Sequence, residues 1–136
     1  MRPILVDSSV WIDHFADRAT WATNELGRLL GRESVATADL IVMELLQGVR
    51  SRRELRLLED GLTSLPCHEL GGLERARSAA ANYRLLRAEG VTPRSPIDVL
   101  IATFCIEEDF VLLTSDRDFT LMTAHLELEL HGLPLS

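Results

Sequence analysis

The fold is decided by residues 3–16, which read PILVDSSVWIDHFA. The first apolar residues of this stretch predict a buried strand over residues 3–7. Ser8 or Ser9 is a plausible N-cap for a helix that continues to the end of the stretch. Asp7 therefore lies where a strand ends and a helix begins. In an α/β sheet this is the edge at which ligands bind.

Short strand-like runs alternate with longer helical patterns along the rest of the chain. The expected strands are 34–37, 65–69, 110–114 and 126–130, and the further expected helices are 20–31, 39–48, 50–60, 72–89, 96–108 and 117–123. Ser95 followed by Pro96 is typical of a helix start. The alternation predicts one α/β domain over residues 1–136. We expect a three-layer sandwich around a central, mostly parallel sheet of four to five strands.

Four acidic residues stand beside or inside apolar runs where a folded chain does not normally place them. They are Asp7, Glu44, Asp98 and Asp116. Taken singly, the three aspartates have ordinary explanations as turn, cap or capping-box residues. Glu44 has none, because residues 40–46 are apolar on all sides of it. An unpaired buried carboxylate is costly, and the chain contains no lysine. A divalent cation shared by all four acids is the simplest way to balance them.

The chemistry of such a cluster follows from its oxygen ligands. Two bare carboxylates about 4 Å apart repel by roughly 4 kcal/mol at an effective dielectric constant of about 20, so the group needs a cation to stay ionised. Oxygen ligands without thiolate or imidazole favour Mg²⁺, with Mn²⁺ as an alternative, over zinc or copper. A site of this kind suits hydrolysis at phosphate. The absence of lysine argues against P-loop and phosphoaspartate chemistry, and no glycine-rich turn follows the first strand to bind a dinucleotide.

Charge and hydropathy limit the other possibilities. The net charge of −7 disfavours a general nucleic-acid coat, but it is compatible with a nuclease whose own carboxylates bind cations. No apolar run approaches the ~20 residues that a membrane-spanning helix requires. The N-terminal stretch also lacks the features of a signal peptide. The expected location is therefore the cytoplasm.

Arginines cluster on the helix expected over residues 50–60. They are Arg50, Arg52, Arg53 and Arg56. One interpretation is a solvated face paired with Glu54, Glu59 or Asp60. The other is contact with the phosphates of single-stranded or looped RNA.

Four sequence blocks together resemble the signature of PIN-domain nucleases, and most closely the VapC toxins of bacterial toxin–antitoxin pairs. The blocks are residues 5–12 (LVDSSVWI), 44–48 (ELLQG), 98–102 (DVLIA) and 113–119 (LTSDRDF), and the resemblance extends from about residue 4 to residue 130. It implies a PIN-like fold and a magnesium-dependent endoribonuclease that cleaves RNA. It also implies a homodimer and inhibition by a VapB-type antitoxin.

The resemblance also assigns roles to individual residues. Asp7, Glu44, Asp98 and Asp116 match the acidic quartet of the family. The working hypothesis is that the three aspartates bind Mg²⁺, while Glu44 binds a second ion or orients the attacking water. Asp118 matches a further acid, and Ser9 matches a hydroxyl residue that helps to hold the site. The pair at residues 104–105, Phe-Cys, departs from the small residues of many relatives without touching the acids.

Two alternatives from other functional classes stay open at this point. The chain could be a catalytically inactive PIN-like interaction module, although all four acidic positions are kept. It could instead be a metal-dependent DNA nuclease or phosphatase, since no sequence motif marks contact with a 2′-hydroxyl.

Overall fold

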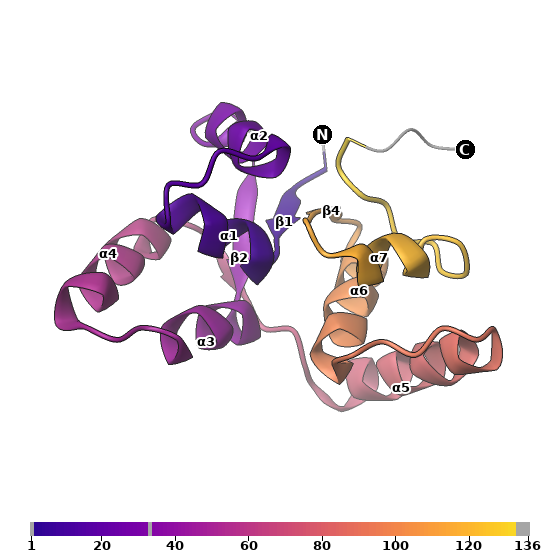
Figure 1. Ribbon diagram of the computed structural model, residues 1–136. Coiled ribbons are helices and arrows are strands. Elements are labelled where there is room, and N and C mark those ends of the chain that lie inside the picture. The colour runs from indigo at the N-terminus through magenta and orange to yellow at the C-terminus, as the bar shows by residue number, and fades with distance from the viewer. Residues whose placement is uncertain (1, 33, 133–136) are drawn as a thin grey trace.

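A central parallel sheet organises the computed structural model, which describes residues 2–32 and 34–132 (Figure 1). Within these residues the strands are β1 (Ile4–Val6), β2 (Val35–Ala38), β3 (Cys67–His68) and β4 (Val111–Leu113). Their order across the sheet is β3-β2-β1-β4, and every neighbouring pair is parallel. Strand order thus runs outward from β1 to β3 and then returns to the other side of β1. This reversal places the topological switch point at the carboxyl ends of the neighbouring strands β1 and β4.

Helices cover the sheet on both sides, which confirms the predicted α/β fold. In the described residues they are α1 (Ser8–Phe15), α2 (Trp21–Leu29), α3 (Asp39–Gln47), α4 (Arg52–Thr63), α5 (Leu73–Ala88), α6 (Pro96–Glu108) and α7 (Arg117–Met122). Figure 1 shows α1 to α4 grouped on one side of the strands and α5 to α7 on the other. Right-handed crossovers explain this division, because the chain reverses its direction across the sheet after β3.

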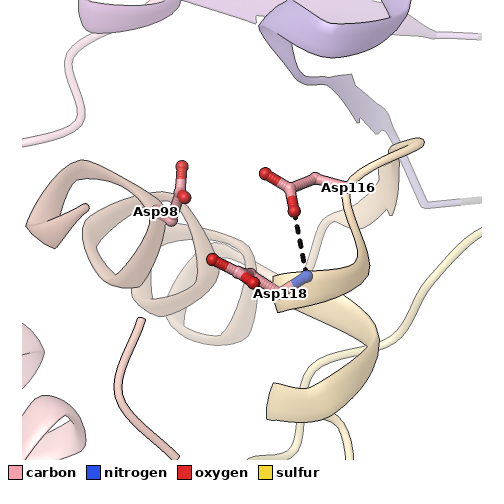
Figure 2. Close-up of side chains that lie close together, drawn as sticks. All are labelled: Asp98, Asp116 and Asp118. Carbon is pink, nitrogen blue, oxygen red and sulfur yellow. Dashed lines mark hydrogen bonds between the residues drawn. The ribbon is translucent and has the colours of Figure 1, made fainter. Parts of the chain in front are cut away.

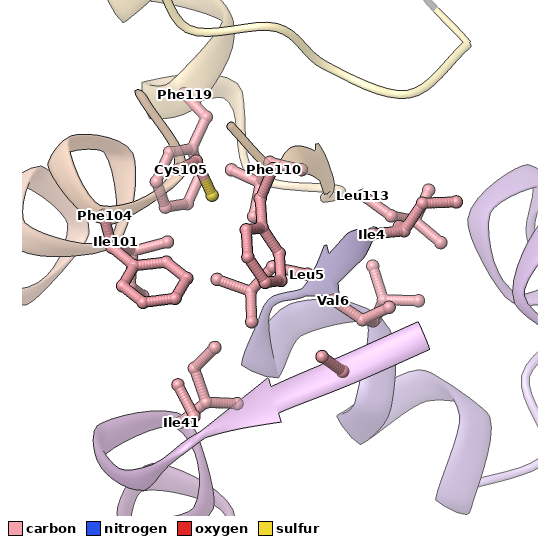
Figure 3. Close-up of a cluster of buried hydrophobic side chains, with 14 of the residues drawn as sticks. Ile4, Leu5, Val6, Ile41, Ile101, Phe104, Cys105, Phe110, Leu113 and Phe119 are labelled. Carbon is pink, nitrogen blue, oxygen red and sulfur yellow. The ribbon is translucent and has the colours of Figure 1, made fainter. Parts of the chain in front are cut away.

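The core lies where the central strands meet the helices of both layers. Leu5 and Val6 of β1 are fully buried, and Ile41 of α3 and Ile101 of α6 lie around them (Figure 3). Phe119 of α7 is fully buried in the same cluster. A parallel sheet that is covered on both faces needs continuous apolar strands rather than alternating ones, and the sequence supplies them.

The strand expected over residues 126–130 is the one predicted element that does not form. Only an isolated parallel bridge joins Leu130 to Leu112 of β4. The Leu112 backbone N–H donates to Glu129 at 3.0 Å, and the His131 N–H donates to Leu112 at 2.8 Å. Both bonds are made by Leu112, the middle residue of β4. Because β4 has only three residues, few other backbone groups on this edge are left to pair with a further strand.

None of the helices in the described part of the chain is both long and apolar enough to span a bilayer.

Candidate metal centre

Acidic residues converge at the switch point because each one either follows a strand that ends there or lies in the first turn of a helix that begins there. Asp7 follows β1, and Asp116 follows the neighbouring strand β4. Asp98 and Asp118 lie in the first turns of α6 and α7. The start of α6 is fixed as predicted, since the Ser95 hydroxyl accepts a hydrogen bond from the Ile97 N–H at 3.2 Å and Pro96 is the first helical residue.

The closest group consists of Asp98, Asp116 and Asp118. Each offers one carboxylate oxygen, and these three oxygens lie within 4.8 Å of one another. Figure 2 shows these half-buried side chains pointing toward one space between the starts of α6 and α7. Asp118, expected as a secondary site residue, is therefore part of the central group. Asp7 and Glu44 do not belong to this group of three. They contribute to the site electrostatically, because their charges are among those that raise the pKa of Asp98.

Asp7 is the most buried of the acids, with only 3% of the residue exposed. Its Oδ1 accepts a hydrogen bond from the Ser9 hydroxyl at 2.6 Å, and its Oδ2 accepts one from the Thr114 hydroxyl at 2.7 Å. Burial raises the pKa of Asp7 to about 6, against the opposing effect of these two hydrogen bonds. Asp7, rather than Ser8 or Ser9, is the N-cap of α1. The Ser9 hydroxyl binds the Asp7 carboxylate instead.

The two hydroxyls also tie the chain after β4 to the end of β1. The Ser9 hydroxyl accepts from the Ser115 N–H at 3.1 Å, and the Thr114 hydroxyl accepts from the Asp116 N–H at 2.9 Å. The position of Asp116 is thus set through Thr114, which the sequence reasoning missed. The only signal for Thr114 was a polar β-branched residue between a buried strand and an acid.

Asp98 carries a carboxylate that no hydrogen bond satisfies within the described residues. Burial is the first cause that raises its pKa, to about 7, and the negative charges of Asp116, Glu44, Asp7 and Asp118 add to the shift. A carboxylate with a raised pKa and no local partner is one that gains strongly from a cation.

Glu44 also fits a cation site. Its Oε1 is buried without a hydrogen-bond partner, and burial raises the pKa of its carboxyl group. A buried, unpartnered oxygen in a native fold calls for an unseen water or ion. Glu44 and the carboxylates of the central group offer only hard oxygen ligands, which fit Mg²⁺ or Mn²⁺.

Arg94 is a site residue that the sequence reasoning did not identify. Its guanidinium donates to Asp116 and Asp118 at 3.1 Å each. Among the described residues it is the one cation in an ion pair with the central group. Its position in the loop between α5 and α6 gave no pattern from which the contact could be predicted.

The basic cluster in and just before α4 is exposed. It comprises Arg50, Arg52, Arg53 and Arg56. In the part of the chain that the structure describes, none of the four forms an ion pair with the acids that were expected to neutralise them. The Glu54 carboxylate instead accepts from the Arg50 backbone N–H at 3.0 Å. The guanidinium groups are therefore available to a ligand in solution.

Comparisons with known proteins agree with this geometry. The model of the PIN domain matches residues 4–124. Ribonuclease VapC11 of Mycobacterium tuberculosis and a VapC ribonuclease of Mycobacterium bovis are each 32% identical over 128 residues, which cover 93% of this chain and 96% of each relative.

Solved structures show the same fold at much lower identity. The VapBC2 complex of Rickettsia felis, bound to a DNA fragment from its promoter, matches with a TM-score of 0.73 at 17% identity, over 94% of this chain and 96% of that chain. The DNA-bound VapBC complex of Salmonella typhimurium matches with a TM-score of 0.72 at 18% identity, over 96% and 98%. With the acidic group at the switch point and relatives along nearly the whole chain, this protein belongs to the PIN-domain family, among its VapC ribonucleases.

Proposed function

We propose that this protein is the toxin of a toxin–antitoxin pair, a metal-dependent endoribonuclease that hydrolyses RNA phosphodiesters. The observation that carries the proposal is the convergence of Asp98, Asp116 and Asp118 within 4.8 Å at the switch point. The relatives named as VapC ribonucleases support the substrate class.

Asp98, Asp116 and Asp118 are the residues that would hold the metal, with Asp7 and Glu44 beside them. A bound Mg²⁺, or Mn²⁺ in its place, would lower the pKa of a bound water and screen the negative charge of the phosphate. Asp7 orients the site, since its hydrogen bonds to Ser9 and Thr114 fix the chain that carries Asp116. Glu44 offers an unpartnered oxygen that can accept a hydrogen bond from the attacking water.

The arginines beside α4 are the proposed RNA contacts. Their side chains are exposed and have no ion-pair partner in the described residues, which is what phosphate contact requires. Leu58 and Leu62 bury the opposite face of α4 in the core, so the helix presents its basic residues outward on a fixed support. The guanidinium fork suits phosphate oxygens better than a point charge does.

An antitoxin is the proposed protein partner, as several structural neighbours are toxin–antitoxin complexes. An apolar groove of about 300 Å³ lies between α1, α3 and α4 and is the candidate surface. Ile12 and Leu57 in its wall are 50% and 58% exposed, and Glu44 and Glu54 also line it. These features fit an amphipathic antitoxin segment that carries a basic residue. A Leu57→Arg variant should lose co-purification with the antitoxin encoded next to it, whereas Leu73→Arg, on the exposed start of α5, should retain it.

The remaining parts of the proposal concern assembly and location. We expect a homodimer, which analytical ultracentrifugation of the purified protein would show as twice the chain mass. We place the protein in the cytoplasm, where RNA and a newly made antitoxin are both present.

One experiment separates the proposed activity from its alternatives. Purified protein with Mg²⁺ is incubated with RNA, single-stranded DNA and a small phosphomonoester, beside an Asp98→Asn control. Cleavage of RNA alone, lost in the control and in EDTA, supports the ribonuclease. Cleavage of DNA or of the phosphomonoester instead would replace it with the nuclease or phosphatase alternative. A calorimetric Mn²⁺ titration that shows no binding would indicate an inactive interaction module.

A further inference from the structure

Arg94 holds two of the three central carboxylates while leaving most of its own side chain in solvent. Its Nε donates to Asp118 Oδ2 and its Nη2 donates to Asp116 Oδ1, both at 3.1 Å. The side chain of Arg94 is 76% exposed, compared with 21% for Asp116 and 17% for Asp118. Among the described residues, these ion pairs are the contacts that hold the guanidinium in place. Exposed ion pairs of this kind are weak and easily exchanged.

The backbone of Arg94 is tied to the site independently of its side chain. Its N–H donates to Asp118 Oδ2 at 3.3 Å. The guanidinium can therefore leave the carboxylates while the residue stays at the rim of the site. The side chain would then remain within reach of a ligand that binds there.

The oxygens that Arg94 occupies belong to the acids that would hold the metal. Asp116 Oδ1 accepts both from Arg94 and from the Asp118 N–H, the latter at 2.9 Å. The second oxygens of Asp116 and Asp118, and both oxygens of Asp98, have no hydrogen-bond partner among the described residues. The central group thus holds three carboxylates against one guanidinium. A divalent cation brings twice the charge of Arg94 and would contact all three acids.

We propose that Arg94 is a displaceable counter-ion, which neutralises Asp116 and Asp118 in the metal-free protein and turns outward to bind RNA phosphate when a divalent cation takes these carboxylates. The proposal rests on the proposed function for the identity of the cation and of the RNA. It predicts that metal and RNA strengthen each other's binding, because metal binding frees a phosphate ligand. Arginine suits both roles, since its planar fork pairs with carboxylate and with phosphate.

A fixed positioning role for Arg94 predicts the opposite effect on metal binding. If Arg94 mainly orients the carboxylates, its removal should weaken the metal site, as loss of outer hydrogen-bond partners does in other sites. If Arg94 competes with the cation, its removal should tighten the site. The sign of the change in the dissociation constant separates the two roles.

Calorimetric titration of Mn²⁺ alone into the metal-free protein is the first test. Arg94→Gln should bind Mn²⁺ about tenfold more tightly than the wild type, because a positive charge no longer opposes the ion. Arg94→Lys should stay near the wild type. Arg32→Gln, in the exposed turn after α2, is the matched control for the loss of one arginine charge. Unchanged or weaker binding in Arg94→Gln overturns the proposal. If neither wild type nor Arg94→Gln binds Mn²⁺, the proposed function falls together with it.

RNA binding is the second test and does not depend on turnover. Fluorescence anisotropy measures the affinity for a pool of single-stranded RNA in EDTA and in Ca²⁺, with a gel to confirm that the RNA stays intact. Wild-type affinity should rise on adding Ca²⁺. In Arg94→Gln the rise should be smaller, and the slope of log affinity against log salt in Ca²⁺ should be lower by about 0.7. An equal rise in both proteins would refute the transfer of Arg94 to phosphate.

Discussion

The buried carboxylate of Asp7 should make the metal-free protein less stable at neutral pH, and Asp7→Asn should remove that cost. Burial raises the pKa of Asp7 from 3.8 to about 6. Between these values the native state binds more protons than the unfolded state, so the free energy of unfolding falls as pH rises through this window. Above about pH 6 the loss is complete. A shift of about 2 pKa units corresponds to about 3 kcal/mol.

The size of the effect depends on pH in a way that identifies its cause. From the same pKa values, the gain in Asp7→Asn should be about 1 kcal/mol near pH 4.5 and about 3 kcal/mol near pH 7.5. The asparagine amide must also replace a hydrogen bond that the carboxylate accepts from Ser9 or Thr114. This mismatch costs about 1 kcal/mol at both pH values, which lowers both gains and leaves their difference of about 2 kcal/mol.

Urea unfolding in EDTA at the two pH values measures this difference. Asp60→Asn is the matched control, because it removes one exposed carboxylate of α4 that stays hydrated in both states. A gain that does not grow with pH, or a loss at neutral pH, would refute the reasoning. With saturating Mg²⁺ the order should reverse. The wild type then gains stability from ion binding, whereas a variant without the Asp7 charge gains less.

The remaining predictions test the pH response, the RNA surface and the hydroxyl network. Because burial and neighbouring acids raise the pKa of Asp98 to about 7, Mn²⁺ affinity should rise between about pH 6 and pH 8 with release of a proton; a flat calorimetric profile would contradict this. Arg52→Ala with Arg56→Ala should lower the slope of log RNA affinity against log salt by about 1.4, as two phosphate contacts are lost, and an unchanged slope would exclude their contact. Thr114→Val should destabilise the fold by about 1–3 kcal/mol in urea unfolding, because the Asp7 carboxylate and the Asp116 N–H each lose the hydrogen bond that they make with the Thr114 hydroxyl. Thr63→Val, on the exposed end of α4, should change stability much less.

The strand ends were predictable from the sequence because parallel strands finish at one edge. Two short apolar runs were enough to place Asp7 and Asp116 together, since β1 and β4 are neighbours in the sheet. Asp98 followed from the Ser95-Pro96 helix start, which the structure confirms. What no sequence pattern could give was the distance between these side chains. That distance depends on the register of α6 and α7 against the sheet.

Contacts made by irregular segments could not be predicted from the sequence either, because they too depend on how the elements pack in three dimensions. Arg94 pairs with Asp116 and Asp118 because the chain before α6 passes the start of α7, a tertiary arrangement without periodicity. Asp118 lies close to Asp116 because the Asp116 carboxylate accepts its N–H as the N-cap of α7. The turn interpretation of Asp116 and its proposed role at a metal site are therefore compatible, because one oxygen caps the helix and the other stays free.

The site carries a charge that its surroundings only partly balance. Asp98 and Asp118 lie in the first turns of helices and Asp7 at the cap of another, where the helix dipole favours negative charge. Hydroxyls satisfy Asp7, and Arg94 contacts two of the other acids. The raised pKa values of Asp7 and Asp98 show that these contributions do not fully balance the negative charge of the carboxylates. The unbalanced negative charge lowers the stability of the metal-free fold and also drives cation binding. A variant that removes part of this charge should therefore gain stability and lose metal affinity together.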